Sequence, residues 1–66
     1  MRNRIRELRE AADMTQADLA DRLQVSVPTV SRWESGVIRP SVGNLIQLAE
    51  IFGVTMDEVC GRTATA

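Results

Sequence analysis

Histidine is absent from this sequence of 66 residues, and cysteine occurs once, as Cys60. A single cysteine cannot form an intramolecular disulfide. Structural zinc takes four protein ligands, and the sequence offers no such set, so we expect no metal site. A lone thiol fits the reducing cytoplasm, and Cys60 is expected to be a small, largely apolar side chain on the last helix.

Tyrosine is also absent, and the sequence contains no glycine-rich phosphate-binding loop and no carboxylate pair outside solvated faces. These absences argue against an enzyme and against a bound cofactor, because so short a chain leaves little room for a ligand pocket. No apolar run approaches the roughly 20 residues that a membrane span needs. The basic amino terminus has no apolar stretch behind it, unlike a signal peptide, so we expect a cytoplasmic protein without a membrane partner.

The formal net charge is only −1, which argues against non-specific affinity for polyanions. The charge is unevenly distributed, however. Residues 1–40 contain seven arginines and six acidic residues, whereas residues 41–66 contain one arginine and three acidic residues. Any binding to nucleic acid must therefore come from a local positive face.

Capping residues, glycines and prolines divide the chain into five short helices. The expected helices cover about residues 3–12, 15–24, 26–35, 41–52 and 56–60. The motifs Thr15-x-x-Asp18 and Thr55-x-x-Glu58 are typical of capping boxes. The first helix has one apolar stripe, formed by Ile5, Leu8 and Ala12. No segment shows sustained alternation, so we expect one all-α domain over residues 1–66, with its core in 3–60 and a flexible tail in 61–66.

The most informative stretch is residues 15–36, where two helices are joined by only about three residues. So short a connection forces a steep crossing angle, as in a helix-turn-helix. Ala20 is small where the two helices must approach closely. The apolar residues expected between the helices are Leu19, Leu23, Val25, Val30 and Trp33.

At these residues the sequence resembles the Cro and phage-repressor-like helix-turn-helix family, also called the xenobiotic-response-element type. The matching residues are Gln16, Leu19, Ala20, Leu23, Val25, Val30, Trp33, Glu34 and Gly36. The resemblance covers about residues 3–60 and implies a five-helix, lambda-repressor-like DNA-binding domain. Two features depart from the family: Gln24 replaces the usual glycine of the turn, and Val27-Pro28 replaces polar side chains. If Gln24 adopts a positive φ, the strain is on the order of 1 kcal/mol.

The resemblance implies sequence-specific binding of double-stranded DNA by a transcriptional regulator, most simply a repressor. Val30 and Trp33 point inward, so the opposite face of the third helix is expected to read bases. The base-contacting residues on this interpretation are Val27, Pro28, Ser31 and Arg32. Arg32 can pair with O6 and N7 of guanine, and Val27 and Pro28 can pack on thymine methyl groups. Alternatively, Arg32 pairs with an acid or a phosphate, and Val27 and Pro28 only start the helix.

Phosphate contacts are expected around this reading face. Gln16 opens the second helix, where free backbone N–H groups favour an anion, and resembles the family's phosphate-binding glutamine. The full predicted set is Gln16, Ser26, Ser35, Arg39 and Asn44, although Asn44 can equally be a simple helix-start residue. By the same resemblance, Arg9 and Glu34 form a partly buried, structural ion pair between the first and third helices.

The basic run Arg2, Arg4 and Arg6 is either an arm near DNA or, more simply, a solvated face balanced by Glu7 and Glu10. The resemblance also implies a homodimer on a pseudo-palindromic operator, with recognition helices about 34 Å apart. The expected dimer surface comprises Phe52, Val54, Met56 and Val59, unless these residues simply close the core of the monomer.

A different class of function stays open. The negative net charge and the donor-poor Val27-Pro28 are also compatible with an antitoxin-like or anti-repressor module. Such a module would bind a protein partner, a toxin or an anti-repressor partner, and would have weak DNA affinity. Salt dependence separates the two, because DNA affinity that rests on several phosphate contacts drops steeply with ionic strength.

Overall fold

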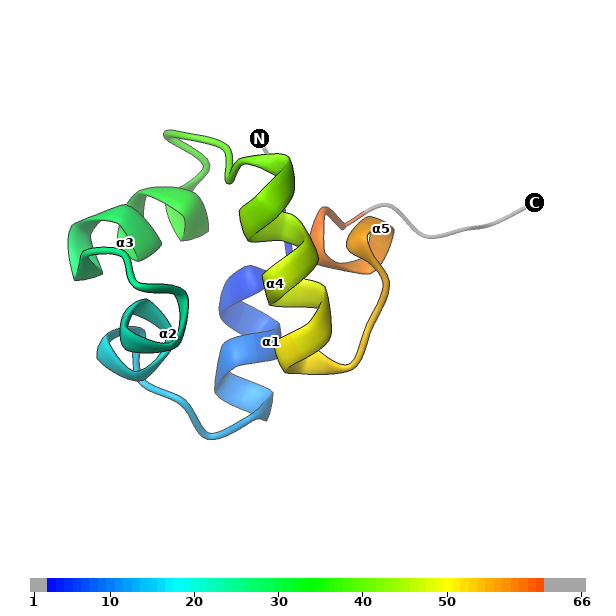
Figure 1. The fold of residues 1–66 in the computed structure, drawn as a ribbon, viewed down its shortest axis with the longest axis horizontal. Coiled ribbons are helices and arrows are strands. Elements are labelled where there is room, and N and C mark those ends of the chain that lie inside the picture. Colours follow the sequence, from blue (N-terminus) through cyan, green and yellow to red (C-terminus); the bar gives the residue numbers. More distant parts are fainter. Residues whose placement is uncertain (1–2, 62–66) are drawn as a thin grey trace.

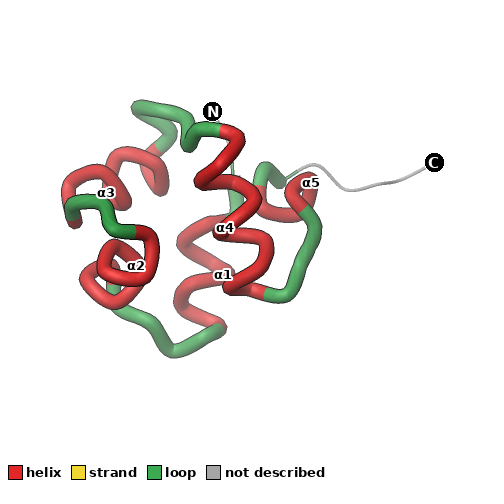
Figure 2. The backbone as a smooth tube through the Cα atoms, in the orientation of Figure 1, coloured by secondary structure: helices red, strands yellow, loops and turns green. Residues whose placement is uncertain are grey.

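The computed structural model describes residues 3–61, which form five helices joined by loops (Figure 1). Within these residues no strand is present (Figure 2). The helices are α1 (Ile5–Ala11), α2 (Gln16–Leu23), α3 (Val27–Ser35), α4 (Val42–Phe52) and α5 (Met56–Val59). The all-α, five-helix prediction is therefore confirmed. The tail predicted to be flexible lies, from residue 62 onward, outside the described residues.

Side-chain caps start four of the helices where the sequence predicts. Thr15 accepts a hydrogen bond from the N–H of Asp18 at 3.0 Å, and the Asp18 carboxylate accepts one from the N–H of Thr15 at 2.9 Å. Thr55 and Glu58 form the same reciprocal box at α5. Single serine caps, Ser26 and Ser41, start α3 and α4. Each cap satisfies N–H groups that have no partner within their own helix.

The first helix is shorter than predicted. It begins at Ile5, whose N–H donates to the side-chain oxygen of Asn3 at 3.1 Å, so Asn3 lies before the helix. It ends at Ala11, because Asp13 adopts a left-handed conformation with φ of 56° and turns the chain toward α2. Ala12 is consequently exposed, and its place in the predicted apolar stripe is wrong. Ile5 is fully buried and Leu8 packs against the core, as expected.

The core draws on all five helices. Its buried apolar residues are Ile5, Leu19, Ala20, Leu23, Val30, Trp33, Leu48, Ala49 and Val59. α2 packs chiefly on α3, and α4 on α5, while α1 contacts both α3 and α4 (Figure 1). The backbone N–H of Arg4 donates to the carbonyl of Val59 at 3.0 Å, which fastens the start of the described chain to the last helix. This frame fixes α3 from behind and leaves its other face uncovered.

Candidate nucleic-acid interface

The third helix divides into a buried face and an exposed face. Val30 is 0% exposed and Trp33 is 2% exposed, so both anchor α3 to the core. The four residues predicted to contact bases, Val27, Pro28, Ser31 and Arg32, are all exposed. Among the described residues, no ion pair involves Arg32. The structure therefore brings the four residues together on one accessible surface.

The turn between α2 and α3 has the strained residue that the sequence suggested. Gln24 adopts φ of 57° and ψ of 44°, in the left-handed region. Its side-chain amide donates to the carbonyl of Asp21 at 2.8 Å, and the N–H of Val25 donates to the carbonyl of Ala20 at 3.0 Å. These local bonds close the end of α2, so a non-glycine residue is held in a conformation that glycine usually supplies.

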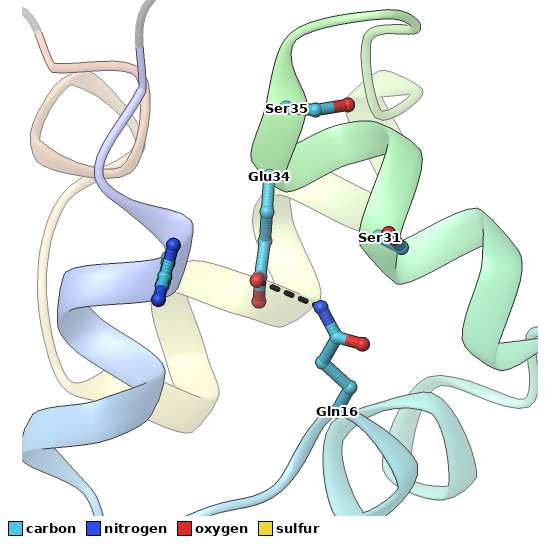
Figure 3. A pocket seen from close by; sticks show the side chains of 5 residues that line it. Gln16, Ser31, Glu34 and Ser35 are labelled. Atoms are coloured by element: carbon cyan, nitrogen blue, oxygen red, sulfur yellow. Dashed lines mark hydrogen bonds between the residues drawn. The ribbon is translucent and has the colours of Figure 1, made fainter.

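A nearly buried ion pair joins α1 to α3. The Nε of Arg9 lies 2.6 Å from Oε2 of Glu34, and Nη2 of Arg9 lies 3.3 Å from Oε1. The amide of Gln16 donates to Oε1 of Glu34 at 3.0 Å, a bond drawn in Figure 3. Hydrogen bonding to Glu34 raises the pKa of Arg9 above its ordinary value, against the opposing effect of burial. The carboxylate thus holds three helices in register, in agreement with the structural role expected for Arg9 and Glu34.

Asn3 also links α1 to α3, a contact that no sequence pattern predicts. Its amide nitrogen donates to the backbone carbonyl of Trp33 at 2.8 Å, across 30 positions of sequence. Its amide oxygen accepts from Ile5 and so caps the first turn of α1. One side chain therefore satisfies the start of α1 and a carbonyl in the last turn of α3. A polar residue before the first apolar position was visible in the sequence, but its distant partner was not.

The residues predicted to contact phosphate fall into separate groups. Gln16 and Ser35 line an open hollow of about 170 Å³ between α1, α2 and α3, together with Arg6, Ser31 and Glu34. Figure 3 shows Ser31 and Ser35 on α3, with Gln16 rising from α2 toward Glu34. We call this feature the three-helix hollow. It connects the reading face, through Ser31, with the amino-terminal end of α2.

The other predicted phosphate contacts lie outside this hollow. Ser26 is exposed at the start of α3, where its hydroxyl accepts from the N–H of Thr29 and lies 2.8 Å from the Thr29 hydroxyl. Arg39 is exposed in the loop after α3. Asn44 is half-buried in the first turn of α4, and its N–H donates to the Ser41 hydroxyl at 3.1 Å. Along the chain, Ser26 precedes α3, and Arg39 and Asn44 follow it.

The basic run at the amino terminus is paired with acidic residues on α1. Arg4 contacts Glu7 at 3.2 Å, and Arg6 contacts Glu10 at 3.4 Å. Both pairs are solvent-exposed, as expected for a balanced, solvated face. Arg2, the third member of the run, lies outside the described residues.

The predicted dimer surface needs a correction. Val59 is 0% exposed, because its side chain belongs to the core, so it offers no surface to a second subunit. Phe52, Val54 and Met56 are half-buried and pack against the core. The exposed large apolar side chains lie elsewhere, on α3, in the loop after it and on α4: Val27, Val37, Ile38, Val42 and Ile46. A four-residue helix is too short for its periodicity to separate a core face from a surface face.

Residues 3–61 contain no cluster of three or more histidine, cysteine or acidic side chains able to hold a metal ion. In the same part of the chain, no helix is long and apolar enough to cross a membrane. Cys60 is a half-buried free thiol at the C-cap of α5, one residue beyond the helix on which it was expected.

Comparison with known proteins relates nearly the whole chain to transcription factors. A family model described as helix-turn-helix matches residues 5–59. The cryptic phage CTXphi transcriptional repressor RstR of Vibrio cholerae is 35% identical over 65 residues, which are 98% of this chain and 58% of that protein. The HTH-type transcriptional activator BcrR of Enterococcus faecalis is 38% identical over 56 residues, 85% of this chain and 28% of that protein. The chain thus spans less than two thirds of either relative.

A solved structure shares the fold. The transcriptional regulator from Listeria innocua superposes with a TM-score of 0.80 over 100% of this chain and 65% of that chain, at 24% sequence identity. At this identity the likeness establishes the five-helix architecture and its order of helices.

Proposed function

Since the chain belongs to the Cro/C1-type helix-turn-helix family of transcriptional regulators, we propose that it binds double-stranded DNA sequence-specifically through α3. One observation carries the proposal. Val27, Ser31 and Arg32 are exposed along a helix that Val30 and Trp33 hold from behind. A helix fixed on one side and bare on the other can enter the major groove, which is about 12 Å wide.

Arg32 is the principal reader in this proposal. Its guanidinium projects from the second turn of an exposed helix face, and its planar fork matches the O6 and N7 acceptors of guanine. Val27, 40% exposed, and Pro28 present apolar surface at the start of the same helix, which suits a thymine methyl group. The reading face therefore combines one strong hydrogen-bonding position with one apolar position.

Phosphate contacts from Gln16, Ser26, Ser35, Arg39 and Asn44 hold the duplex in register. The side chain of Gln16 has a double role, because its amide nitrogen is bonded to Glu34 while its oxygen is left to accept. Backbone contacts of this kind position a protein on DNA but carry no base information. Their number sets how steeply the affinity falls as salt is added.

The regulator acts as a repressor and as a homodimer on a pseudo-palindromic operator in this proposal. The relative RstR is named a repressor, which supports repression rather than activation. The relative BcrR, however, is named an activator. Two copies would place their recognition helices in successive major grooves, about 34 Å apart. Phe52, Val54 and Met56, which are only half-buried, supply the contact between the copies.

Selection of bound duplexes from a random pool tests the proposal. We expect enrichment of a site with two related half-sites and at least one conserved guanine, and a particle mass of a dimer by light scattering on the same sample. The affinity for the selected site should fall steeply between about 50 and 200 mM salt. Failure to enrich any duplex, or an affinity that ignores salt, would instead favour a protein-binding module of the antitoxin or anti-repressor type.

A further inference from the structure

We propose that Arg6, on α1, is a phosphate-binding residue that extends the DNA interface beyond the helix-turn-helix; this inference rests on the function proposed above. Arg4 and Arg6, two arginines that the sequence grouped together, have different surroundings: Arg4 is the N-cap of α1 and Arg6 lies within it. Arg6 lines the three-helix hollow with Gln16, Ser31 and Ser35. Arg4 instead lines a separate hollow with Asn3, Glu7 and Gly61. Only Arg6 shares a surface with the reading helix.

The position of the hollow beside α3 indicates that a phosphate backbone of bound DNA passes over it. Ser31 belongs both to the reading face and to the lining of the hollow. A helix inserted in a major groove has a phosphate backbone on each side, because the groove is only slightly wider than the helix. One of these strands must therefore run beside Ser31 and Ser35, over the open side of the hollow. Arg6 stands across the hollow from α3 on the neighbouring helix, where it can meet that strand.

Among the charged side chains that line the hollow, only Arg6 is available to attract an anion. Glu34 also lines it, but its carboxylate is neutralised by Arg9 and accepts a third bond from Gln16. The remaining polar groups, the hydroxyls of Ser31 and Ser35, are neutral. Arg6 is therefore the cation that this hollow can offer to a phosphate oxygen.

The present partner of Arg6 can be exchanged. Its Nε lies 3.4 Å from Oε2 of Glu10, and the two side chains are 71% and 56% exposed. Exposed pairs of this kind contribute little to stability, so a phosphate can replace the carboxylate at small cost. Glu10 then becomes a restraint on DNA binding, because it competes with the phosphate for Arg6.

The test compares Arg6→Ala with Arg4→Ala, which removes the same charge from the N-cap position of α1. Anisotropy titrations of a selected duplex and an unrelated duplex, at several salt concentrations, give the dissociation constant and the slope of log affinity against log salt. For Arg6→Ala we expect affinity for both duplexes to fall about 3- to 10-fold and the slope to shrink by about 0.9. For Arg4→Ala we expect a change of less than about twofold and an unchanged slope. Thermal melting confirms that both variants fold.

Two further variants sharpen the result. Arg6→Lys keeps the charge and should retain most of the salt slope, and Glu10→Gln should tighten binding to both duplexes by about 2- to 5-fold. Equal slopes for the Arg6→Ala and Arg4→Ala variants would overturn the inference. So would an altered base preference in Arg6→Ala, which would make Arg6 a base reader. A wild-type protein that binds no duplex would instead overturn the proposed function itself.

Discussion

Arg9 and Glu34 hold α1 against α3 through a two-point ion pair, with an Nε–Oε2 distance of 2.6 Å and an Nη2–Oε1 distance of 3.3 Å. Their side chains are 11% and 6% exposed. Arg9 also donates from Nη1 to the carbonyl of Met14 at 2.8 Å, which ties the loop before α2 to the same point. The pair thus lies where three segments of the framework meet.

Replacing Glu34 by alanine should destabilise the fold by about 3 kcal/mol, because it leaves the guanidinium of Arg9 largely buried without a counter-charge. Urea unfolding followed by Trp33 fluorescence measures this loss. Glu7→Ala is the matched control, since Glu7 also pairs with an arginine but is 70% exposed, and it should cost less than about 1 kcal/mol. Similar losses in the two variants would show that the buried pair has no special role.

Gln24→Gly should stabilise the protein by about 0.5–1 kcal/mol, because glycine adopts a positive φ without the clash that Gln24 tolerates. The lost amide bond to Asp21 reduces the gain. Gly53→Ala is the inverse control: its φ is 67° and an added Cβ would meet nothing within 4 Å, so its cost is purely conformational. The two melting temperatures should move in opposite directions. A lower melting temperature for Gln24→Gly would mean that the side-chain bond outweighs the strain.

Stability should decline as the pH falls below about 4, in part through Asp18. Hydrogen bonds from the backbone and side chain of Thr15 hold the pKa of Asp18 below its ordinary value of 3.8. The unfolded chain therefore binds a proton more readily, so this contribution is present above pH 4 and is lost as the pH drops through the native pKa. Asp18→Asn should flatten that part of the profile in urea unfolding from pH 6 to pH 2.5. Parallel profiles for both proteins would contradict this assignment.

Local signals in the sequence explain why so much of the fold could be predicted. Thr15, Ser26, Ser41 and Thr55 cap helices through bonds that span three residues, so the sequence itself contains both partners. The buried and exposed faces of α3 could likewise be predicted from a local pattern, the three-residue spacing of Val30 and Trp33. Even the left-handed Gln24 was foreseeable, because the family pattern places a glycine there.

The features that the sequence did not predict depend on the tertiary arrangement of the helices. The bond from Asn3 to the carbonyl of Trp33 links positions 30 apart, and no local pattern specifies it. Asp13 ends α1 in a left-handed conformation without glycine, so the predicted helix ran one residue too far. Val59 is buried because α5 closes the core beside Arg4, which a four-residue helix cannot reveal. The Arg6 contribution to the hollow likewise arises only when α1 packs beside α3.

Arg32→Ala should weaken binding to the selected operator by about 1–3 kcal/mol and relax the preference at one base pair. Arg39→Ala should weaken all duplexes about equally, because a phosphate contact carries no base information. Affinities for the operator and for single-base variants of it measure both effects. If Arg32→Ala keeps its affinity and base preference, α3 reads DNA through other side chains.

Met56→Glu should convert the proposed dimer into a monomer, because it places a charge in the contact assigned to Phe52, Val54 and Met56. Light scattering and operator binding report the change together. Val42→Glu is the control, since Val42 is 66% exposed on α4 and lies outside that contact. The opposite result, with Val42→Glu alone breaking the dimer, would move the subunit contact to the exposed apolar side chains of α4.

The bond between Asn3 and the end of α3 has a consequence for engineering. The backbone carbonyl of Trp33 is held by a side chain that precedes the whole motif, and the neighbouring Arg4 is bound to α5. Residues 15–36 transplanted onto another scaffold would therefore lose the clamp on their last turn, together with the Arg9 counter-ion. The orientation of α3 is a property of the complete five-helix unit, so we expect unwinding of the first turn of α1 to change the direction in which Arg32 points.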